Sequence, residues 1–389
     1  NTGRESENDE AKGNEKRKKN QVWEKKKEKR FRYRNREKER RFRYLNQGKR
    51  EKTLEESDMK KRVLAGLLTA AIAASALTGC GSGDSASNGG NKNAKYQVGV
   101  LQLVQHPALD RATEGFKAAL HDKLGSEVNI DVQNAAGDTA QCSTIANSFV
   151  SAGDDLIFAN ATGALQAAAA ATADIPIVGT SVTDYATALS IDNWSGTTGK
   201  NITGTSDLAP LDQQADMLEE LFPVADYSKV GIIYCSAETN SKYQADEITK
   251  ALTAKGYTVE AFQFSDSNDV ASVTQSACDA SDVLYVPTDN TAANCAENIN
   301  NVALPAKTPI IAGEEGICAG CGVATLSIDY YDLGYAAGEM AYDILVNGAD
   351  PSTMQIEYAP EVTKEYNADI CEKLGVEIPA DYTAIKKDK

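Results

Sequence analysis

The chain of 389 residues is long enough for two or three domains, and its formal net charge is −16 at pH 7. The charge is unevenly distributed: residues 1–58 hold 21 Lys and Arg against 13 Asp and Glu, which leaves 19 basic and 43 acidic residues for the remainder. Such an acidic body excludes nucleic acid as a partner, because phosphate contacts need clustered Lys and Arg.

The basic run between Lys16 and Arg50 allows three interpretations. Such runs are typical of a disordered, solvated segment, or of a tail that binds RNA or membranes. The third interpretation is that the run precedes the true start, because Met59-Lys60-Lys61-Arg62 resembles one and Glu55-Glu56-Ser57 can be encoded by a purine-rich stretch resembling a ribosome-binding site. We therefore expect residues 1–58 to be a basic leader that the natural product lacks.

Residues 59–79 have the pattern of an export signal, with basic residues first and then a predominantly apolar stretch of 15 residues from Val63 to Leu77. That stretch is shorter than the ~20 residues of a membrane span. The letters LTGC that end at Cys80 resemble the lipobox of bacterial lipoproteins, although a buried helix that ends in Cys is the alternative. We expect Cys80 to carry lipid at the outer face of the cytoplasmic membrane, with residues 80–94 as a flexible tether.

Seven further cysteines follow, and Cys318 and Cys321 have CxxC spacing. This spacing occurs in redox sites and in halves of metal sites. No second CxxC is present, and His106 and His121 lie far away in the sequence. The pattern therefore favours a local disulfide or two free thiols and predicts no metal site. The seven are Cys142, Cys235, Cys278, Cys295, Cys318, Cys321 and Cys371.

From Tyr96 onward, apolar runs alternate with stretches of helical spacing. Strands are expected in the first half at residues 96–104, 128–132, 156–159 and 175–179. Helices are expected over residues 107–124, 139–151 and 162–173. Repeated strand–helix–strand units with near-continuous apolar strands predict a parallel sheet that is covered on both faces.

The second half repeats this order. Strands are expected at residues 229–234, 258–264, 283–286 and 309–312, and helices over residues 239–255, 270–280 and 291–302. Residues 156–184 and 283–316 are alike in detail, since each holds a strand, a polar turn with Thr, a helix, an x-Pro-Ile-x strand and a polar loop. A helix at 330–347, a strand near 355–358 and a short helix near 367–374 follow. The predicted fold class is α/β, with two doubly wound parallel-sheet lobes.

Polar residues follow the strands of both halves, and open parallel sheets bind ligands beyond the carboxyl ends of their strands. Thr162 and Thr291 begin helices, whose free N–H groups favour an anion such as a carboxylate; ordinary N-capping is the alternative. Acidic residues at the same rim either pair with a ligand ammonium group or remain solvated. These are Asp184, Glu238, Asp289, Glu315 and Asp329.

Motifs of catalysis and cofactor binding are absent from the sequence. Neither GxSxG, GxxxxGK[ST] nor GxGxxG occurs, and His106 has no recognisable nucleophile arrangement. Glu314 or Glu315 could pair with Asp184 for acid–base chemistry, but the spacing is not diagnostic. We therefore expect a binding protein, not an enzyme, and no cofactor.

Motifs spread over Tyr96 to Lys389 resemble the ABC-transporter substrate-binding lipoproteins associated with tryptophan/tyrosine-type uptake. Singly each motif is weak, and in combination they are specific. The matching segments are Val100–Gln102 with His106–Asp110 and Gly115–Phe116, Gln133–Ala135 with Gly137–Asp138, Asn201–Gly204, Tyr234 with Glu238–Ser241, Pro287–Thr291, and Asp329–Tyr331 with Gly334.

This resemblance implies a type I periplasmic-binding fold with three hinge crossovers, which we place near Ser206–Leu208, Leu326–Ile328 and Thr353–Gln355. The N-lobe would comprise residues 95–207 with 328–352, and the C-lobe residues 208–327 with 353–389. The resemblance also implies a monomer that captures a small molecule by hinge closure and delivers it to an ABC permease.

For the ligand we favour a zwitterion, namely an aromatic or branched amino acid. Its carboxylate would lie at the helix start of Thr162 and its ammonium group at Asp289 or Glu238, with Tyr185 or Tyr330 beside the side chain. A sugar, a nucleoside or a peptide is the alternative ligand, and a sensory lipoprotein that presents its ligand to a membrane receptor is the alternative role.

The ligand contacts are expected in loops of both lobes. The sequence departs from the family pattern at Tyr185, where Pro is expected, and at Cys318 and Cys321, where the loop usually lacks cysteine. The predicted contact residues are Gln102, His106, Thr162, Gly163, Ala164, Asp184, Glu238, Asn240, Ser241, Asp289, Asn290 and Glu315.

Overall fold

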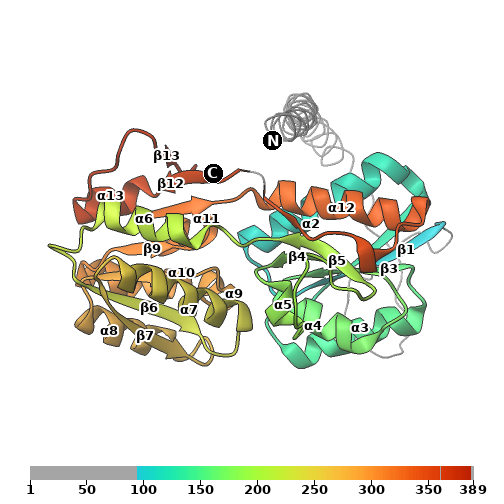
Figure 1. The fold of residues 1–389 in the computed structure, drawn as a ribbon, viewed down its shortest axis with the longest axis horizontal. Helices are drawn as coiled ribbons and strands as arrows, with labels where there is room; N and C mark the ends of the chain where they lie inside the picture. The colour runs from blue at the N-terminus through green and yellow to red at the C-terminus, as the bar shows by residue number, and fades with distance from the viewer. Residues whose placement is uncertain (1–93, 360, 387–389) are drawn as a thin grey trace, which may run out of the picture. The chain divides into compact units, whose positions relative to one another are not determined.

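The computed structural model describes residues 94–359 and 361–386 (Figure 1). The leader, the export signal, Cys80 and nearly all of the tether lie outside these residues. Among the residues described, every helix is too short or too polar to cross a membrane.

The first lobe contains a six-stranded sheet in the order β11-β5-β4-β3-β1-β2, and all of its strand pairs are parallel. In Figure 1, α2 and α12 lie above this sheet, and α3 and α4 lie below it. The strands are β1 Tyr96–Gln102, β2 Val128–Asn134, β3 Leu156–Asn160, β4 Ile177–Val182, β5 Ile202–Ser206 and β11 Glu357–Tyr358. The helices are α2 Pro107–Leu124, η1 Gly125–Glu127, α3 Thr139–Ala152, α4 Thr162–Ala171, α5 Tyr185–Ala188, α12 Tyr330–Asn347 and η2 Pro351–Thr353.

The second lobe contains a seven-stranded sheet in the order β13-β12-β10-β9-β8-β6-β7, in which the β10–β12 pair is antiparallel. The strands are β6 Lys229–Cys235, β7 Thr258–Phe264, β8 Val283–Val286, β9 Ile310–Ala312, β10 Ala324–Ser327, β12 Thr363–Tyr366 and β13 Thr383–Ala384. The helices are α6 Leu211–Leu221, α7 Thr239–Ala254, α8 Val270–Ala280, α9 Asn290–Asn294, α10 Ala296–Ala306, α11 Glu315–Cys321 and α13 Ala368–Leu374. The α/β prediction with two parallel-sheet lobes is confirmed.

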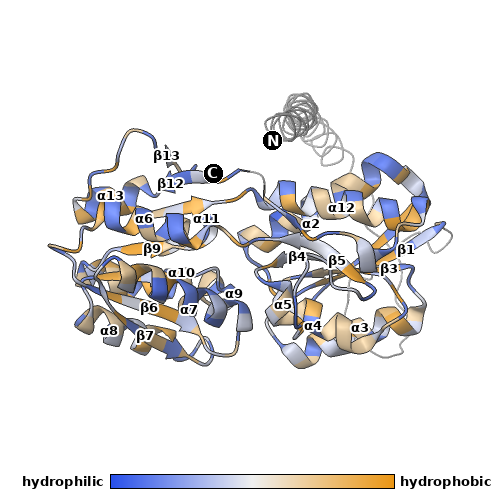
Figure 2. Ribbon diagram, in the orientation of Figure 1, coloured by the Kyte–Doolittle hydropathy of each residue, from blue (hydrophilic) through white to orange (hydrophobic). Residues whose placement is uncertain are grey.

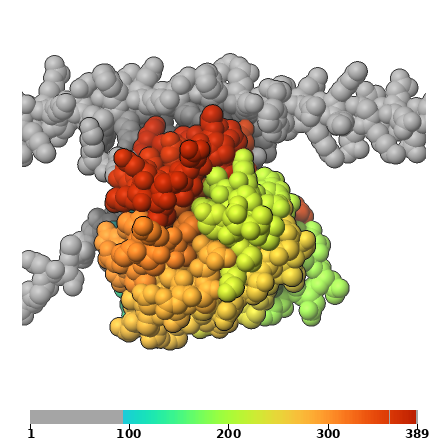
Figure 3. All heavy atoms as spheres, turned by 90° about the vertical axis from the view of Figure 1, so that its left-hand side faces the viewer, coloured from blue at the N-terminus to red at the C-terminus, as the bar shows by residue number. Residues whose placement is uncertain are grey.

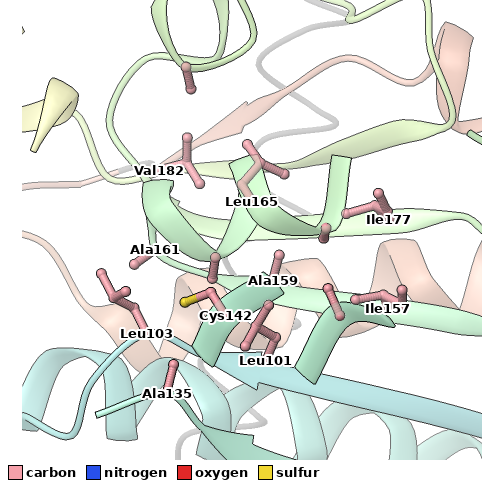
Figure 4. Packing of buried hydrophobic residues seen from close by; sticks show 14 of the residues in the cluster. Leu101, Leu103, Ala135, Cys142, Ile157, Ala159, Ala161, Leu165, Ile177 and Val182 are labelled. Carbon is pink, nitrogen blue, oxygen red and sulfur yellow. The ribbon is translucent and has the colours of Figure 1, made fainter. Parts of the chain in front are cut away.

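Both sheets are built from buried apolar strands, which Figure 2 shows as orange segments among helices of mixed orange and blue. Every residue of β3 and of β8 is buried. Figure 4 shows the first-lobe core, in which Leu101, Ile157 and Ile177 from three strands pack with Leu165 of α4 and Cys142 of α3. Full burial on both faces explains why these strands are read as continuous apolar runs in the sequence.

Two glycines bring α2 and α12 into close contact above the first sheet. A Cβ on Gly334 would collide with the backbone oxygen of Ala112, and a Cβ on Gly115 would collide with that of Tyr331. Glycine is therefore required on both helices, because no side chain fits between their backbones. This packing attaches α12, which follows the second-lobe strand β10, to the first lobe.

The chain passes between the sheets three times: between β5 and α6, between β10 and α12, and between β11 and β12. The predicted third crossover at Thr353–Gln355 is wrong. Glu357–Tyr358 still belongs to the first sheet, since it pairs with Thr205–Ser206 of β5. The crossing therefore lies between Tyr358 and Thr363, and the N-lobe extends beyond the predicted end at residue 352.

After the third crossover, the C-terminal segment packs on α6 of the second lobe. Glu220 of α6 accepts hydrogen bonds from Lys364 Nζ (3.0 Å) and from the Tyr382 hydroxyl (2.8 Å). Figure 3 shows this segment, in red, directly beside the yellow-green surface of α6. The predicted helix over residues 291–302 is in fact two helices, α9 and α10, which meet at Cys295.

Candidate ligand-binding site

Loops of both lobes meet beyond the carboxyl ends of their strands, and we call this place the interlobe site. His106, after β1, contacts Asn290 at the start of α9 in the second lobe, with 3.2 Å between Nε2 and Oδ1. Gln244 of α7 donates to the hydroxyl of Thr183, which follows β4, at 3.3 Å. These contacts bring together the loops that carry the residues predicted from the sequence.

Three hydroxyl or ring atoms on the first-lobe side of the interlobe site are buried without a hydrogen-bond partner among the described residues, and Asn160 Oδ1 at the end of β3 also lacks one. The three are His106 Nδ1, Thr162 Oγ1 and Ser181 Oγ. These side chains are only 7, 3 and 6% exposed. They lie at the carboxyl ends of β1, β3 and β4, which are adjacent in the sheet. An unpartnered buried polar group costs roughly 1–3 kcal/mol, so three at one edge indicate a place for a polar ligand.

Backbone strain occurs at the same edge. Ala161, which precedes α4, has φ 95° and ψ 158°, and Ser181 has φ 53°. Residues other than Gly rarely adopt these backbone conformations, which cost on the order of 1–3 kcal/mol and concentrate at functional sites. The first turn of α4, with Thr162, Gly163 and Ala164, has no side-chain cap. Its free N–H groups are thus available to an anion.

The second lobe satisfies the corresponding helix start with its own carboxylate. Glu238 accepts from the amides of Asn290 (3.1 Å) and Thr291 (2.8 Å) at the start of α9. It also accepts from the Thr291 hydroxyl (2.7 Å) and from the side-chain amides of Asn290 (2.6 Å) and Asn240 (3.1 Å). The carboxylate of Glu238 therefore stabilises α9.

Asp289 is also engaged by its own lobe. Its carboxylate accepts from the amides of Cys235 (2.6 Å) and Ala292 (2.7 Å), and the Ser241 hydroxyl bonds to it as well. Burial raises the pKa of Asp289, and the charge of Glu238 raises it further by a smaller amount. Asn240 Nδ2 donates to the Thr288 carbonyl (3.2 Å). These residues fix the shape of the second-lobe loops, and their contact with a ligand stays a prediction.

The hydrogen-bond chain from Glu238 fixes the tautomer of His106. Asn290 donates its amide N–H to Glu238, so its Oδ1 is the acceptor for His106 and the proton lies on Nε2. Burial lowers the pKa of His106 and favours the neutral ring. The buried Nδ1 is therefore a bare acceptor, and only a donor N–H or O–H can satisfy it.

Gln102 and Asp184 have local structural partners. Gln102 donates to the carbonyl of Val104 (2.9 Å) and to Asp110 (2.7 Å), and it accepts from Thr113 (2.7 Å). Gln102 thereby ties the loop after β1 to α2. Asp184 caps α5 by accepting from the amide of Thr187 (2.7 Å). Neither contact tests the predicted role in ligand binding.

Two further residues of the predicted site differ in burial. Tyr185 is buried in the first-lobe core, where its hydroxyl donates to the Thr205 carbonyl (3.2 Å), and its place beside a ligand stays a prediction. Glu315 is exposed at the start of α11, whereas Glu314 is only 2% exposed. Glu314 is therefore a second candidate of this loop, and ligand contact by Glu315 stays a prediction.

Sequence reasoning missed a buried polar network at the hinge. Asp207, in the first crossover, accepts from the hydroxyls of Tyr330 (3.0 Å) and Thr183 (3.1 Å). Gln244 joins Thr183 to the Thr288 carbonyl of the second lobe (3.1 Å). The network thus links a crossover to loops of both lobes. Its only sequence signal is an acid directly after the buried strand β5.

All seven cysteines of the described residues are free thiols. Cys318 and Cys321 lie one turn apart on α11, and Cys321 donates to the Ile317 carbonyl (3.3 Å). Burial raises the pKa of both thiols, which favours the unreactive protonated form. Of the two alternatives for this pair, the structure has the free thiols. The part of the chain that the structure describes contains no group of His, Cys, Asp and Glu that could hold a metal ion.

Two α/β lobes, three crossovers and an interlobe site are the architecture of solute-binding proteins. Residues 97–386 match the family described as "ABC transporter substrate binding protein", and the chain belongs to this family. Families of this kind bind a small molecule and act outside the cytoplasm.

The chain is 40% identical over 294 residues to the tyrosine-binding protein of Clostridioides difficile (strain R20291), which covers 73% of this chain and 84% of the relative. A streptococcal domain solved in complex with L-Trp is 32% identical, with a TM-score of 0.70, and the match covers 74% of this chain and 97% of the other. A ligand-free, open substrate-binding protein with adhesive properties from Clostridium difficile is 36% identical, with a TM-score of 0.59 and coverage of 75 and 100%.

Solved structures of lower identity share the fold. A glucose–galactose-binding protein from Geobacillus stearothermophilus is 16% identical with a TM-score of 0.52, over 70% of this chain and 97% of the other. The type I periplasmic-binding fold implied by the sequence is therefore confirmed.

Proposed function

We propose that this protein captures an aromatic amino acid with a polar tip, tyrosine or tryptophan, at the interlobe site. The observation that carries the proposal is the set of three unpartnered buried atoms of His106, Thr162 and Ser181, which lie at the carboxyl ends of β1, β3 and β4. The relatives named for tyrosine and solved with L-Trp support the same class of ligand.

The ligand carboxylate would lie at the start of α4. Thr162 Oγ1 and Ser181 Oγ supply hydroxyl donors there, and the free amides of the first turn of α4 supply more. Charged hydrogen bonds of this kind are about twice as strong as neutral ones. The surrounding structure keeps Ala161 in its strained conformation without a ligand, so the turn is already formed before the ligand binds. This reduces the entropy lost on binding.

His106 Nδ1 would accept a hydrogen bond from the polar tip of the side chain. A phenol O–H or an indole N–H provides the donor that the neutral ring needs, and phenylalanine lacks it. A site with a buried hydrogen-bonding group discriminates strongly against a ligand without the partner. The chain Glu238–Asn290–His106 would make this contact depend on both lobes.

Calorimetry and thermal shift on the full-length chain test the proposal, with tyrosine, tryptophan, phenylalanine, leucine, glucose and adenosine as ligands. Tyrosine or tryptophan should raise the melting temperature and bind at least about 10-fold tighter than phenylalanine. Stabilisation by glucose or adenosine alone would refute an amino-acid ligand. Equal affinity for tyrosine and phenylalanine would refute the role of His106.

We further propose that lipid on Cys80 keeps a monomeric binding domain close to an ABC permease. A flexible tether raises the local concentration of the domain at its partner. Metabolic labelling with a fatty acid should label the wild-type chain and not a Cys80→Ala variant. Retained label in that variant would contradict the anchor.

A further inference from the structure

Two acidic side chains are buried at the hinge without a cationic partner among the described residues. Asp207 is 3% exposed and Glu314 is 2% exposed. The ion pairs within the described residues all involve other carboxylates. A buried carboxylate is costly unless a cation compensates it or a proton neutralises it. Hydrogen bonds from the chain reach both oxygens of each carboxylate, but no cation among the described residues compensates their charge.

The two acids come from different parts of the molecule and are joined by a chain of hydrogen bonds. Thr183 donates to Asp207, and Gln244 donates both to Thr183 and to the Thr288 carbonyl. The Thr288 hydroxyl donates to the carbonyl of Gly313, the residue before Glu314. Tyr330 donates to Asp207 at 3.0 Å, and the charges of Asp207 and Glu314 both act on that phenol. The charge of Asp207 also acts on Glu314. Burial raises the pKa of Asp207 to about 6 and that of Glu314 to about 7, so both release a proton readily when a cation approaches.

This acid pair adjoins the unpartnered first-lobe groups. The amide of Asp207 donates to the carbonyl of Val182 (3.3 Å), the residue that follows Ser181. Ser181, whose hydroxyl has no partner, lies in β4, and α4 begins after β3. Asp207 follows β5, the strand on the other side of β4. Neighbouring strands lie about 4.8 Å apart. A ligand that carries a carboxylate and an ammonium group on one carbon spans such adjacent positions.

We infer that Asp207 and Glu314 bind the ammonium group of the ligand, at the hinge end of the interlobe site. The inference rests on the proposed function, and it deepens that function by assigning the cationic end of the zwitterion. Glu238 and Asp289, which the sequence suggested for this role, are engaged by five and three donors of their own lobe. Asp207 and Glu314 have fewer donors, two hydroxyls and two backbone amides respectively.

This arrangement couples ligand charge to lobe movement. Asp207 lies in the first crossover, Tyr330 follows the second, and Glu314 caps α11 in the second lobe. An ammonium group between the carboxylates joins these moving parts, because it attracts both acids at once. Hinge closure then depends on the ligand amine and not only on its side chain.

Ligands that differ by one charged group test the inference on the full-length chain. The probes are tyrosine, its deaminated analogue 3-(4-hydroxyphenyl)propionate, and the decarboxylated analogue tyramine. In wild type, removal of the amine should weaken binding about 30-fold or more, as expected for loss of a buried charge partner. In Asp207→Asn and Glu314→Gln, tyrosine should lose that advantage over the deaminated analogue, and affinity for the analogue itself should hold or rise. The matched control is Glu315→Gln, which changes the exposed neighbour and should keep the wild-type ratio.

A second measurement uses the wild-type chain alone and does not depend on how the variants fold. Calorimetry near pH 6.5 in buffers of different ionisation enthalpy should show proton release with tyrosine and none with the deaminated analogue, because an ammonium group lowers the pKa of both acids. The other titratable groups that face this pair are Tyr185, Tyr330, Glu315, Cys318 and Cys321.

The outcomes separate the two proposals. If tyrosine binds but both variants keep the wild-type preference for the amine, or if no proton is released, the assignment of Asp207 and Glu314 is wrong and the proposed function stands. If the preference is lost instead in Glu238→Gln or Asp289→Asn, the ammonium group binds in the second lobe. If neither tyrosine nor tryptophan binds to wild type, both proposals fail.

Discussion

The two lobes have the same architecture, yet their sides of the interlobe site differ in hydrogen bonding. The first lobe leaves the hydroxyls of Thr162 and Ser181 without partners and holds Ala161 in a strained conformation. The second lobe places Glu238 on the equivalent helix start and satisfies Asp289 from its own backbone. Equivalent elements have therefore diverged: the first lobe leaves its helix start without a side-chain partner, and the second fills the equivalent position with its own carboxylate.

The largest stability effect should come from Glu238. Glu238→Ala leaves the start of α9 and the side chains of Asn290 and Thr291 without their acceptor, so we expect a loss of about 3 kcal/mol in the free energy of unfolding. Urea denaturation measures this loss. Glu315→Ala, on the exposed start of α11, is the control and should change stability by less than about 0.5 kcal/mol. Similar stability of both variants would mean that the second lobe does not rely on this carboxylate.

The next largest effect should be a dependence of ligand-free stability on pH. The two hinge acids contribute to it, together with the other carboxyls whose pKa burial raises, Asp154, Glu365 and Asp289. The pKa values of Asp207 and Glu314 are raised by burial to about 6 and about 7, above their ordinary values of 3.8 and 4.5. The folded state therefore binds more protons than the unfolded state. The contribution of these two acids to the free energy of unfolding is fully present below about pH 4. It is lost as the pH rises through 6 and 7, by on the order of 2 kcal/mol. Denaturation at pH 5 and pH 8 measures it, and Asp207→Asn should flatten the profile. A wild-type protein more stable at pH 8 would contradict the prediction.

A matched pair of threonine variants compares the two helix starts directly. Thr162→Val removes an unpartnered hydroxyl, so the free protein should keep or gain stability while tyrosine binds about 10-fold more weakly. Thr291→Val removes a hydroxyl that donates to Glu238, so the free protein should lose about 1 kcal/mol with little change in affinity. Calorimetric titration and urea denaturation give both quantities. The opposite pattern would reverse the roles that we assign to the lobes.

The smallest effect should come from relief of strain. Ala161→Gly allows φ 95° without steric cost, so the free protein should gain up to about 1 kcal/mol, while tyrosine affinity falls slightly because the turn is less fixed. Ala164→Gly, inside the first turn of α4, is the control and should lose about 1 kcal/mol. Thermal melts with and without tyrosine separate the two effects. Loss of stability in Ala161→Gly would show that the conformation is not strained.

Most elements of the fold could be predicted because their signals are local. Helix α8 has its expected bounds at Val270–Ala280, and β3 and β8 follow from short apolar runs between polar turns. The third crossover could not be located, because the two residues of β11 are exposed and carry no apolar pattern. Their place in the first sheet depends on pairing with β5, more than 150 residues earlier in the chain.

In the candidate site, too, features with a local sequence signal could be predicted, and features that depend on distant residues could not. Thr162 could be found because it begins a helix after an apolar strand, and that position needs no knowledge of neighbours. The choice between Glu314 and Glu315 could not be made, since adjacent acids look equivalent in sequence and only the cap geometry of α11 buries the first of them. Asp207 was missed because its partners, Tyr330 and Thr183, are distant in the chain.

The sequence by itself determined the two-lobed α/β architecture, the loops that reach the interlobe site and, through its motifs, the family. These depend on apolar periodicity and on short motifs, which are properties of contiguous residues. Only the tertiary structure decided which polar groups are satisfied and which remain free for a ligand. Glu238 and Asp289 proved to be engaged within their own lobe, whereas Thr162, Ser181 and His106 each keep an unpartnered atom. Hydrogen bonds and burial are settled by neighbours in space, and a single sequence does not contain them.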